Sequence, residues 1–186
     1  MAVINIGGEE YKLTCGMSDC NNNMHTFMQT RKSKAENIEK GCCTQCKSSL
    51  VNWKRIHKND ISDFDYTKSA LQFEMIRNVY WGIKEPSHEM IEKVRNLGYD
   101  NLTNKIESRL KTTLKKPKKE NDWDGRQTPF DSDNLIMWGQ HATGTCCRGC
   151  LEYWHGIDAN AQMTDQNYSY LKEVLLEYVK DKLAKL

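Results

Sequence analysis

Apolar residues alternate with polar ones on both sides of Gly7-Gly8. Period-two alternation around a two-residue glycine turn predicts a β-hairpin with strands over 3–6 and 9–14. A weaker alternation predicts two further strands, over 25–29 and 50–57. The first part of the chain is therefore expected to be rich in β-structure.

Helical spacing dominates the rest of the chain. Apolar residues three and four positions apart predict one helix over 67–81, a second that begins at Pro86-Ser87 and a third that begins near Asp100. Another apolar stripe predicts a final helix from about Thr164. The short apolar run 135–138 is predicted to be a buried strand or turn.

Eight cysteines are distributed over both ends of the chain, and their spacing indicates metal binding. Near the N-terminus, a Cys-x4-Cys pair is followed by a Cys-x2-Cys pair, which is the spacing of a zinc ribbon. The predicted ligands of this structural Zn²⁺ are Cys15, Cys20, Cys43 and Cys46. Cys42 and His25 are alternative ligands, and a site of three cysteines and one histidine that uses His25 is the main variant. The competing interpretation treats these cysteines as small buried hydrophobes.

A second set of metal-binding residues lies between positions 141 and 155. The order His-x5-Cys-x2-Cys-x4-His predicts a second Zn²⁺ held by His141, Cys147, Cys150 and His155. Cys146 complicates this set, because it can replace Cys147, pack in the interior, or act as a reactive thiol with a lowered pKa. His155 has the alternative of a packed histidine beside Trp154.

Polar side chains flank this second set. Candidate binding residues are Arg126, Gln127, Gln140 and Arg148, because their amide and guanidinium groups can recognise amides, phosphates or base edges. Candidate catalytic residues are His141, Asp124 and Cys146. The competing interpretation is that these residues form turns and hydrogen-bond the loop.

The net charge of +2 does not identify a class of partner. A local cationic cluster does occur, and it contains Lys111, Lys115, Lys116, Lys118 and Lys119. No apolar run approaches the roughly 20 residues of a membrane span, and the N-terminus lacks the features of a signal peptide. We therefore expect a cytoplasmic protein with no membrane partner, in which cysteines stay reduced.

Three stretches of the C-terminal third resemble the signature of an uncharacterised family of small bacterial and phage proteins. They are Asp-Gly-Arg-Gln-Thr-Pro (124–129), Gln-His-Ala-Thr-Gly-Thr-Cys-Cys-Arg-Gly-Cys-Leu (140–151) and Trp-His-Gly-Ile (154–157). Gly144 stands where that family usually has alanine. Longer members are similar to this chain also in the N-terminal cysteine pattern and in the stretches 53–57 and 73–77. The resemblance names no activity, but it implies that residues 124–157 form one functional unit.

These patterns predict an α+β fold, in which an N-terminal β-rich zinc ribbon precedes a mainly helical part with a second Cys/His metal site. The expected division is a zinc-ribbon-like module over 1–60, a helical segment over 61–116 and a C-terminal metal-site domain over 117–186. Two Zn²⁺ ions are the expected cofactors.

Three functions from different classes fit these features. The first, which these features favour over the other two, is a nucleic-acid-associated zinc protein, in which the lysine cluster binds phosphate and Trp53, Trp81 and Trp123 stack on bases. The second is a metal-dependent hydrolase with its site at residues 124–157, where three ligands leave an open position and His141 or Asp124 moves a proton. The third is an adaptor that binds a host protein. The chain lacks the paired H-x-E and P-C-x-x-C motifs of nucleobase deaminases.

Overall fold

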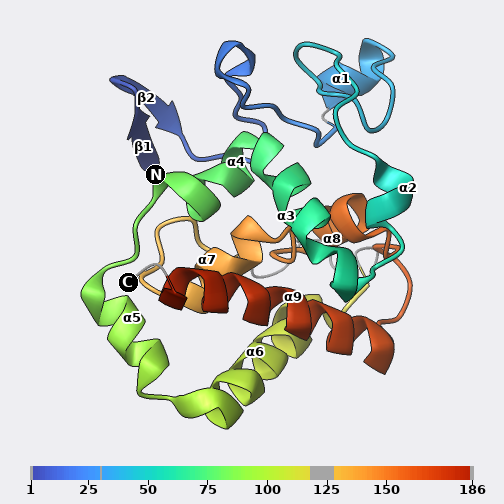
Figure 1. Ribbon diagram of the computed structural model, residues 1–186. Coiled ribbons are helices and arrows are strands. Elements are labelled where there is room, and N and C mark those ends of the chain that lie inside the picture. The colour runs from blue at the N-terminus through green and yellow to red at the C-terminus, as the bar shows by residue number, and fades with distance from the viewer. Residues whose placement is uncertain (1, 30, 118–127, 185–186) are drawn as a thin grey trace.

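The computed structural model describes residues 2–29, 31–117 and 128–184, and most of its regular structure is helical (Figure 1). The elements are β1 (Val3–Ile6), β2 (Glu9–Lys12), α1 (Arg31–Ala35), α2 (Trp53–Ile56), α3 (Phe64–Phe73), α4 (Met75–Asn78), α5 (His88–Arg95), α6 (Gly98–Leu114), α7 (Leu135–Ala142), α8 (Arg148–His155) and α9 (Asp165–Ala184). Short 3₁₀ turns lie at Cys20–Asn22 and Ile61–Asp63, and a π-helical turn lies at Val79–Ile83.

The predicted hairpin is present, since β1 and β2 pair in antiparallel register from Val3 opposite Lys12 to Ile6 opposite Glu9. Its turn needs positive φ at both central positions, and Gly7 and Gly8 have φ of 61° and 93°. Within the described residues, no other strand joins this sheet.

The two further predicted strands are wrong. In the first, His25 makes a single parallel bridge to Glu74, and residues 26–29 have no regular secondary structure. The segment 50–57, predicted as the second strand, contains the helix α2 instead. The Asn52 side chain caps this helix by accepting a hydrogen bond from the Arg55 backbone N–H (3.1 Å).

The helix predicted over 67–81 is interrupted at Glu74, whose ψ of 118° is extended. The interruption arises because the N-terminal segment takes backbone hydrogen bonds there. The His25 N–H donates to the Phe73 carbonyl (2.7 Å), and the Met75 N–H donates to the His25 carbonyl (2.8 Å). The break separates α3 from α4 and places Glu74 between the N-terminal segment and the helical core.

The later helices follow the predicted spacing more closely. The Ser87 hydroxyl caps α5 through the Met90 N–H (3.2 Å), and α9 begins at Asp165, one residue after the predicted start. α6 buries the apolar stripe Leu102, Ile106, Leu110 and Leu114. α6 begins at Gly98, whose φ of 71° is left-handed.

The apolar run 135–138 is helical and forms the first half of α7, so its assignment to a strand or turn is wrong. The Asn134 side chain explains the helix start, since its oxygen accepts hydrogen bonds from the N–H groups of Ile136 (2.9 Å) and Met137 (3.3 Å). Nearly every residue of α7 is buried, and this explains why its sequence lacks a polar face.

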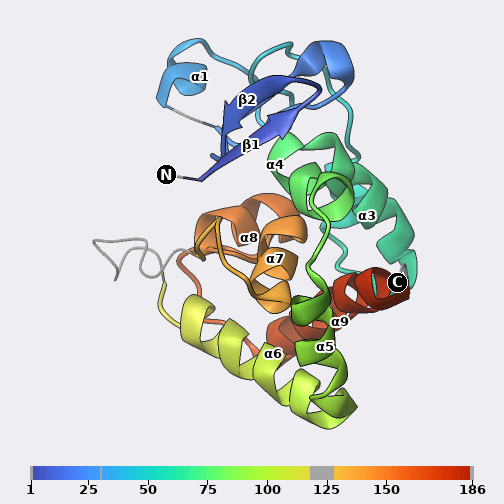
Figure 2. The same cartoon turned by 90° about the vertical axis from the view of Figure 1, so that its left-hand side faces the viewer.

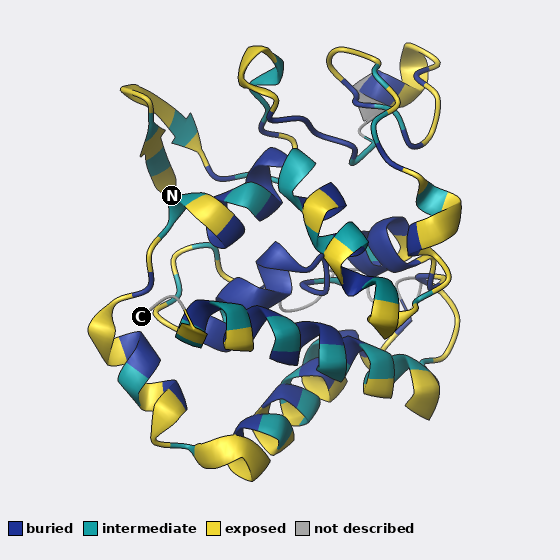
Figure 3. Cartoon of the chain, viewed as in Figure 1, coloured by how far each residue is buried: buried dark blue, intermediate teal, exposed yellow. Residues whose placement is uncertain are grey.

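The hairpin and α1 lie at one end of the molecule, and α6 lies at the other, in both ribbon views (Figures 1 and 2). Helix α9 packs against α6 and α7. Burial is concentrated on the inner faces of the helices (Figure 3), and residues from Leu13 to Val179 belong to one hydrophobic cluster. The three-part division of the chain therefore stays a prediction. None of the helices within the described ranges is both long and apolar enough to cross a membrane.

Candidate metal centres

Four potential metal ligands meet in the N-terminal part of the chain. The side-chain ligand atoms of Cys20, His25, Cys43 and Cys46 all lie within 4.8 Å of one another, and we refer to these residues as the first centre. Two of the distances are short: 3.7 Å from Cys20 Sγ to Cys43 Sγ and 3.4 Å from Cys46 Sγ to His25 Nδ1. A tetrahedral Zn²⁺ with ordinary bond lengths places two sulfurs about 3.8 Å apart and a sulfur and a nitrogen about 3.6 Å apart. The first centre therefore has the dimensions of a zinc site.

Local backbone structure orients both halves of the first centre. Asn23 has a left-handed φ of 58°, and its Oδ1 lies 3.0 Å from His25 Nε2. Because an amide oxygen only accepts, Nε2 carries the proton and Nδ1 presents its lone pair to the centre. In the second half, the Lys47 N–H donates to the Cys43 carbonyl (2.9 Å), and Lys47 has a φ of 65°, so that residues 43–47 form a tight turn.

The structure brings together three of the four ligands that the sequence predicted for this site and replaces Cys15 by His25. This arrangement is the variant with three cysteines and one histidine. Cys42 is half-buried and lies outside the group. The two-stranded hairpin does not contribute a ligand to the first centre, so the structure does not reproduce the predicted zinc ribbon.

A second group of sulfurs lies in the helical core. The Sγ atoms of Cys146, Cys147 and Cys150 are all within 4.8 Å of one another, and these residues are the second centre. Cys147 is the N-cap of α8 and has an extended backbone, and its Sγ accepts the Cys150 N–H (3.5 Å). Capping of α8 thus places the Cys-x2-Cys pair on one helical turn. Both groups can hold a metal ion.

Cys15 belongs to the neighbourhood of the second centre. Its thiol is a close neighbour of the Cys150 thiol, although Cys15 is not in the group of sulfurs that all lie within 4.8 Å of one another. It also lines a cavity of about 280 Å³ together with Cys146, Cys147, His141, Thr14, Thr128 and Phe130. Burial and this sulfur contact raise the pKa of Cys15, with the contact as the larger cause. The residue that sequence spacing assigned to the N-terminal site therefore lies beside the C-terminal one.

A fully buried ion pair supports the second centre from the other side. Arg77 Nε donates to Glu74 Oε2 (2.9 Å), and neither side chain is exposed. The same guanidinium donates to Cys150 Sγ (3.1 Å) and, at longer range, to Cys146 Sγ (3.7 Å). Burial acts to lower the pKa of Arg77, but the Cys150 and Glu74 charges outweigh it and hold that pKa well above its usual value. Arg77 is thus a fixed positive charge next to the sulfurs.

Glu74 is held by groups from distant parts of the chain. The Trp154 indole N–H donates to its Oε2 (2.7 Å), and the Phe27 backbone N–H donates to its Oε1 (3.3 Å). Burial raises the pKa of Glu74, and Arg77 acts against that rise. The carboxyl group therefore connects the N-terminal segment, α8 and the guanidinium in one buried network.

His141 faces the cavity beside the second centre. Its ring is stacked between Tyr80 and Phe130, with centroid distances of 5.0 and 4.6 Å. Nε2 lies 3.2 Å from the Pro129 carbonyl and must donate to it, whereas the buried Nδ1 has no hydrogen-bond partner among the described residues. Burial, and next the charge of Arg77, lower the pKa of His141 to about 4. His141 therefore presents an unpaired acceptor beside the cysteines.

His155, in contrast, has both ring nitrogens engaged within the protein. Nε2 lies 2.8 Å from the Thr143 carbonyl, and Nδ1 lies 3.3 Å from the Tyr170 hydroxyl. The side chain is fully buried, and burial lowers its pKa to about 4. This placement matches the packed histidine that the sequence offered as the alternative to a metal ligand.

Gln140 and Arg148 point into the interior, where they stabilise loops. Gln140 is fully buried, with its Oε1 accepting from Arg109 Nε (2.9 Å). The Arg148 guanidinium donates to the carbonyl oxygens of Ala159 (3.0 Å), Asp158 (3.0 Å) and Ala161. Side chains satisfied in this way are not free to bind an external ligand. The remaining candidates Asp124, Arg126, Gln127, Lys118 and Lys119, together with Trp123, lie outside the described residues.

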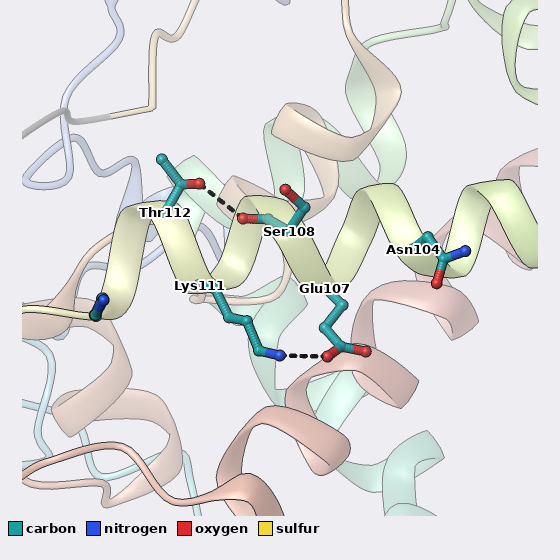
Figure 4. Close-up of a pocket in the computed structure, with 6 residues that line it drawn as sticks. Asn104, Glu107, Ser108, Lys111 and Thr112 are labelled. Carbon is teal, nitrogen blue, oxygen red and sulfur yellow. Dashed lines mark hydrogen bonds and ion pairs between the residues drawn. The ribbon is translucent and has the colours of Figure 1, made fainter.

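The lysine cluster at the end of α6 is exposed where the structure describes it. Lys111 forms an ion pair with Glu107 (2.6 Å) on an open depression of α6 (Figure 4), and Lys115 and Lys116 are solvent-exposed. The aromatic residues that were expected to stack on bases are placed differently. Trp81 is buried, and Trp53 is half-buried with its N–H donated to the Gly41 carbonyl (2.9 Å).

Sequence reasoning missed Arg77 and Glu74 as members of the site. Their signal was available, because two charged residues interrupt an otherwise apolar stretch that includes Leu71, Met75 and Ile76. A charge on the buried face of a helix needs a partner. The predicted helix over 67–81 and the resemblance to longer family members both include residues 73–77, but neither assigns a role to these two charges.

A family model described as a domain of unknown function, DUF4186, matches residues 65–180. This match covers more than half of the chain, so the chain belongs to the DUF4186 family. The second centre and the Glu74–Arg77 pair lie within the matched region, whereas Cys15 and the first centre lie outside it. No solved structure matches the chain.

Proposed function

We propose that this member of the DUF4186 family is a zinc-binding protein with two metal centres. The first centre binds Zn²⁺ through three cysteines and His25, and it is structural. The second centre binds Zn²⁺ through the cysteines that precede and begin α8. The observation that carries the proposal is the geometry of the first centre, where the 3.7 Å and 3.4 Å distances agree with the edges of a zinc tetrahedron.

Zinc has a clear physical task in the first centre. Residues 13–52 contain only α1 and a 3₁₀ turn as regular structure where the chain is described, and many of their side chains are exposed. Some of its apolar side chains join the common hydrophobic cluster, but the segment has little regular structure of its own to offset the entropy of ordering it. A metal ion that joins Cys20, His25 and the Cys43–Cys46 turn supplies the missing free energy, as in small zinc domains.

The second centre differs because it lies within a packed core. Thiolates must replace thiols when zinc binds, and an uncompensated negative charge in the interior is costly. Arg77 meets this requirement, since its N–H groups point at Cys150 and Cys146. A buried donor to a ligand sulfur is the kind of outer-shell contact that metal sites depend on.

Zinc content after single substitutions tests the proposal. Cys46 is exposed, so Cys46→Ser removes a ligand without disturbing the core. We expect this variant to retain about one of two zinc ions per chain, because four-ligand structural sites lose metal when one thiolate is removed. Cys42→Ser is the matched control and should retain both ions. Equal zinc content in the two variants would contradict a metal at the first centre.

A metal-dependent hydrolase is a second candidate, and a specific observation favours it. Cys146 and Cys147 of the second centre line the 280 Å³ cavity together with His141, whose buried Nδ1 has no hydrogen-bond partner among the described residues. Three thiolate ligands would leave one position for water, and His141 could accept a proton from it. This function requires that no fourth protein ligand completes the second centre.

Nucleic-acid association and an adaptor role stay predictions. For nucleic acid, the remaining support is the lysine cluster, because Trp53 and Trp81 are used inside the fold. One of its lysines, Lys111, is neutralised locally by Glu107. For an adaptor that binds a host protein, the two structural zincs would be sufficient, and no particular surface is implied.

A further inference from the structure

We propose that Cys15 is the fourth ligand of the second centre, which makes it a four-cysteine zinc site built from Cys15, Cys146, Cys147 and Cys150. The inference rests on the proposed zinc-binding function and adds to it. It concerns a residue that lies outside the DUF4186 match and that sequence spacing assigned to the other centre.

The first support is the position of the Cys15 sulfur. It lines one cavity together with the Cys146 and Cys147 side chains, and its thiol is close enough to the Cys150 thiol to perturb the pKa of that thiol. Cys15 lies outside the group of sulfurs that are all within 4.8 Å of one another, so a shared metal ion would draw its side chain toward that group. At the first centre, by contrast, Cys20, His25, Cys43 and Cys46 already supply the four ligands of a tetrahedral site, and Cys15 is not among them.

The second support is the way in which the chain holds Cys15 in place. The buried Thr26 hydroxyl donates to the Cys15 carbonyl (3.1 Å). Directly beside Thr26, His25 is hydrogen-bonded to the α3–α4 break through Phe73 and Met75. The backbone of Cys15 is thus anchored to a segment that is itself fixed above Glu74 and Arg77. Cys15 is thereby held beside the cavity that Cys146 and Cys147 also line, which favours a metal ion shared with those cysteines.

The third support is the number and kind of ligands. Structural zinc sites are tetrahedral and closed, with four cysteines among the common ligand sets. Cys146, Cys147 and Cys150 supply three thiolates, and Cys15 supplies the fourth. Arg77 offsets part of the negative charge that four thiolates create. His141 is not required as a ligand.

This arrangement has a consequence for the whole chain. One ligand comes from the segment that follows the hairpin, and three come from the start of α8, so a single ion joins the N-terminal segment to the DUF4186 region. It also leaves no open coordination position, so that it and the hydrolase candidate are alternatives for the same centre.

Substitution at Cys15 gives the first test. In zinc-loaded full-length protein, Cys15→Ser should lower the zinc content from about two ions per chain to about one, as Cys150→Ser should. Cys42→Ser, a cysteine of the same N-terminal region outside both groups, should retain both ions. If Cys15→Ser retains both ions with unchanged affinity, the inference is overturned.

A second measurement uses the wild-type chain and does not depend on a variant that folds. Protein loaded with ¹¹³Cd²⁺ should give two resonances, and the resonance of a four-sulfur site should lie downfield of that of a three-sulfur, one-nitrogen site. Two bound ions without a four-sulfur resonance would overturn the Cys15 assignment alone. Protein that binds no Cd²⁺ and no Zn²⁺ would instead overturn the proposed zinc-binding function.

Discussion

The two centres occupy opposite environments in one small protein. The first is partly exposed and is built by residues close in sequence, in a region with little regular structure. The second is mostly buried, and a charged pair from α4 and its preceding residue supports it. Similar thiolate ligands therefore occur in two different structural environments. Under the proposed zinc binding, the metal at the first centre stabilises a segment with little regular structure, whereas the metal at the second centre must be accommodated within the core.

The largest effect on folding should come from removing the metal of the first centre. With Cys46→Ser, backbone amides of residues 20–48 should lose most of their protection from hydrogen exchange, because structural zinc sites contribute on the order of 10 kcal/mol to the folding of small domains. Amides of α9 should keep their protection. Loss of protection in α9 as well would show that the two regions do not respond separately, and the contrast between the centres would fail.

Breaking the buried ion pair should come next in size. Arg77→Met leaves Glu74 as an uncompensated buried carboxylate and should cost about 3–5 kcal/mol in the free energy of unfolding. Arg55→Met is the matched control, because Arg55 pairs with Asp63 at a similar distance (2.6 Å) but in an exposed position. It should cost at most about 1 kcal/mol. Urea unfolding of both zinc-loaded variants measures the difference, and equal costs would contradict the role given to Arg77.

Acid should weaken the core through His155. Its pKa in the folded state is about 4, against 6.5 for an ordinary histidine, so the unfolded chain binds a proton first as the pH falls. Above pH 6.5, His155 therefore contributes about 3 kcal/mol to the free energy of unfolding. This contribution is lost as the pH falls from 6.5 to about 4.

A substitution isolates the contribution of His155 from the acid release of zinc, which every variant shares. His155→Gln should show a shallower decline of unfolding free energy between pH 7 and 5 than wild type does. The exposed residue His88 provides the control, since His88→Gln should leave the slope unchanged. Identical slopes in wild type and His155→Gln would remove His155 as the origin.

The smallest effect on the fold should come from the lysine cluster. Neutralising Lys115, Lys116, Lys118 and Lys119 together should change the unfolding free energy by no more than about 0.5 kcal/mol per position. If nucleic acid is a partner, the same variant should bind it more weakly and with a flatter dependence on salt. Neutralising the exposed lysines Lys54, Lys58, Lys93 and Lys105 gives a control of equal net charge. Equal binding by both variants would exclude the cluster as the contact surface.

Local signals in the sequence were sufficient for part of this structure. The Gly7-Gly8 turn, the Ser87 cap and the apolar stripes of α6 and α9 act over a few residues, so periodicity predicted them. Spacing likewise found the Cys43–Cys46 turn and the Cys147–Cys150 turn. In each case, the residues that determine the structure are close neighbours in the chain.

The failures have a common physical cause, which is competition from distant segments. Hydrogen bonds from His25 break the helix at Glu74, and that break cannot be read from the helical pattern alone. Burial on all sides removes the polar face of α7, so that its pattern resembles a strand. The choice between Cys15 and His25 at the first centre depends on how the N-terminal segment crosses the core, which spacing does not encode.

The zinc content of the wild-type chain, purified without chelator and measured by elemental analysis against protein concentration, tests the central claim most directly. Two separate ligand groups that each bind one ion predict a ratio of about two zinc ions per chain. A ratio of one would remove one of the two centres, and a ratio near zero would contradict the account of this protein as a zinc protein.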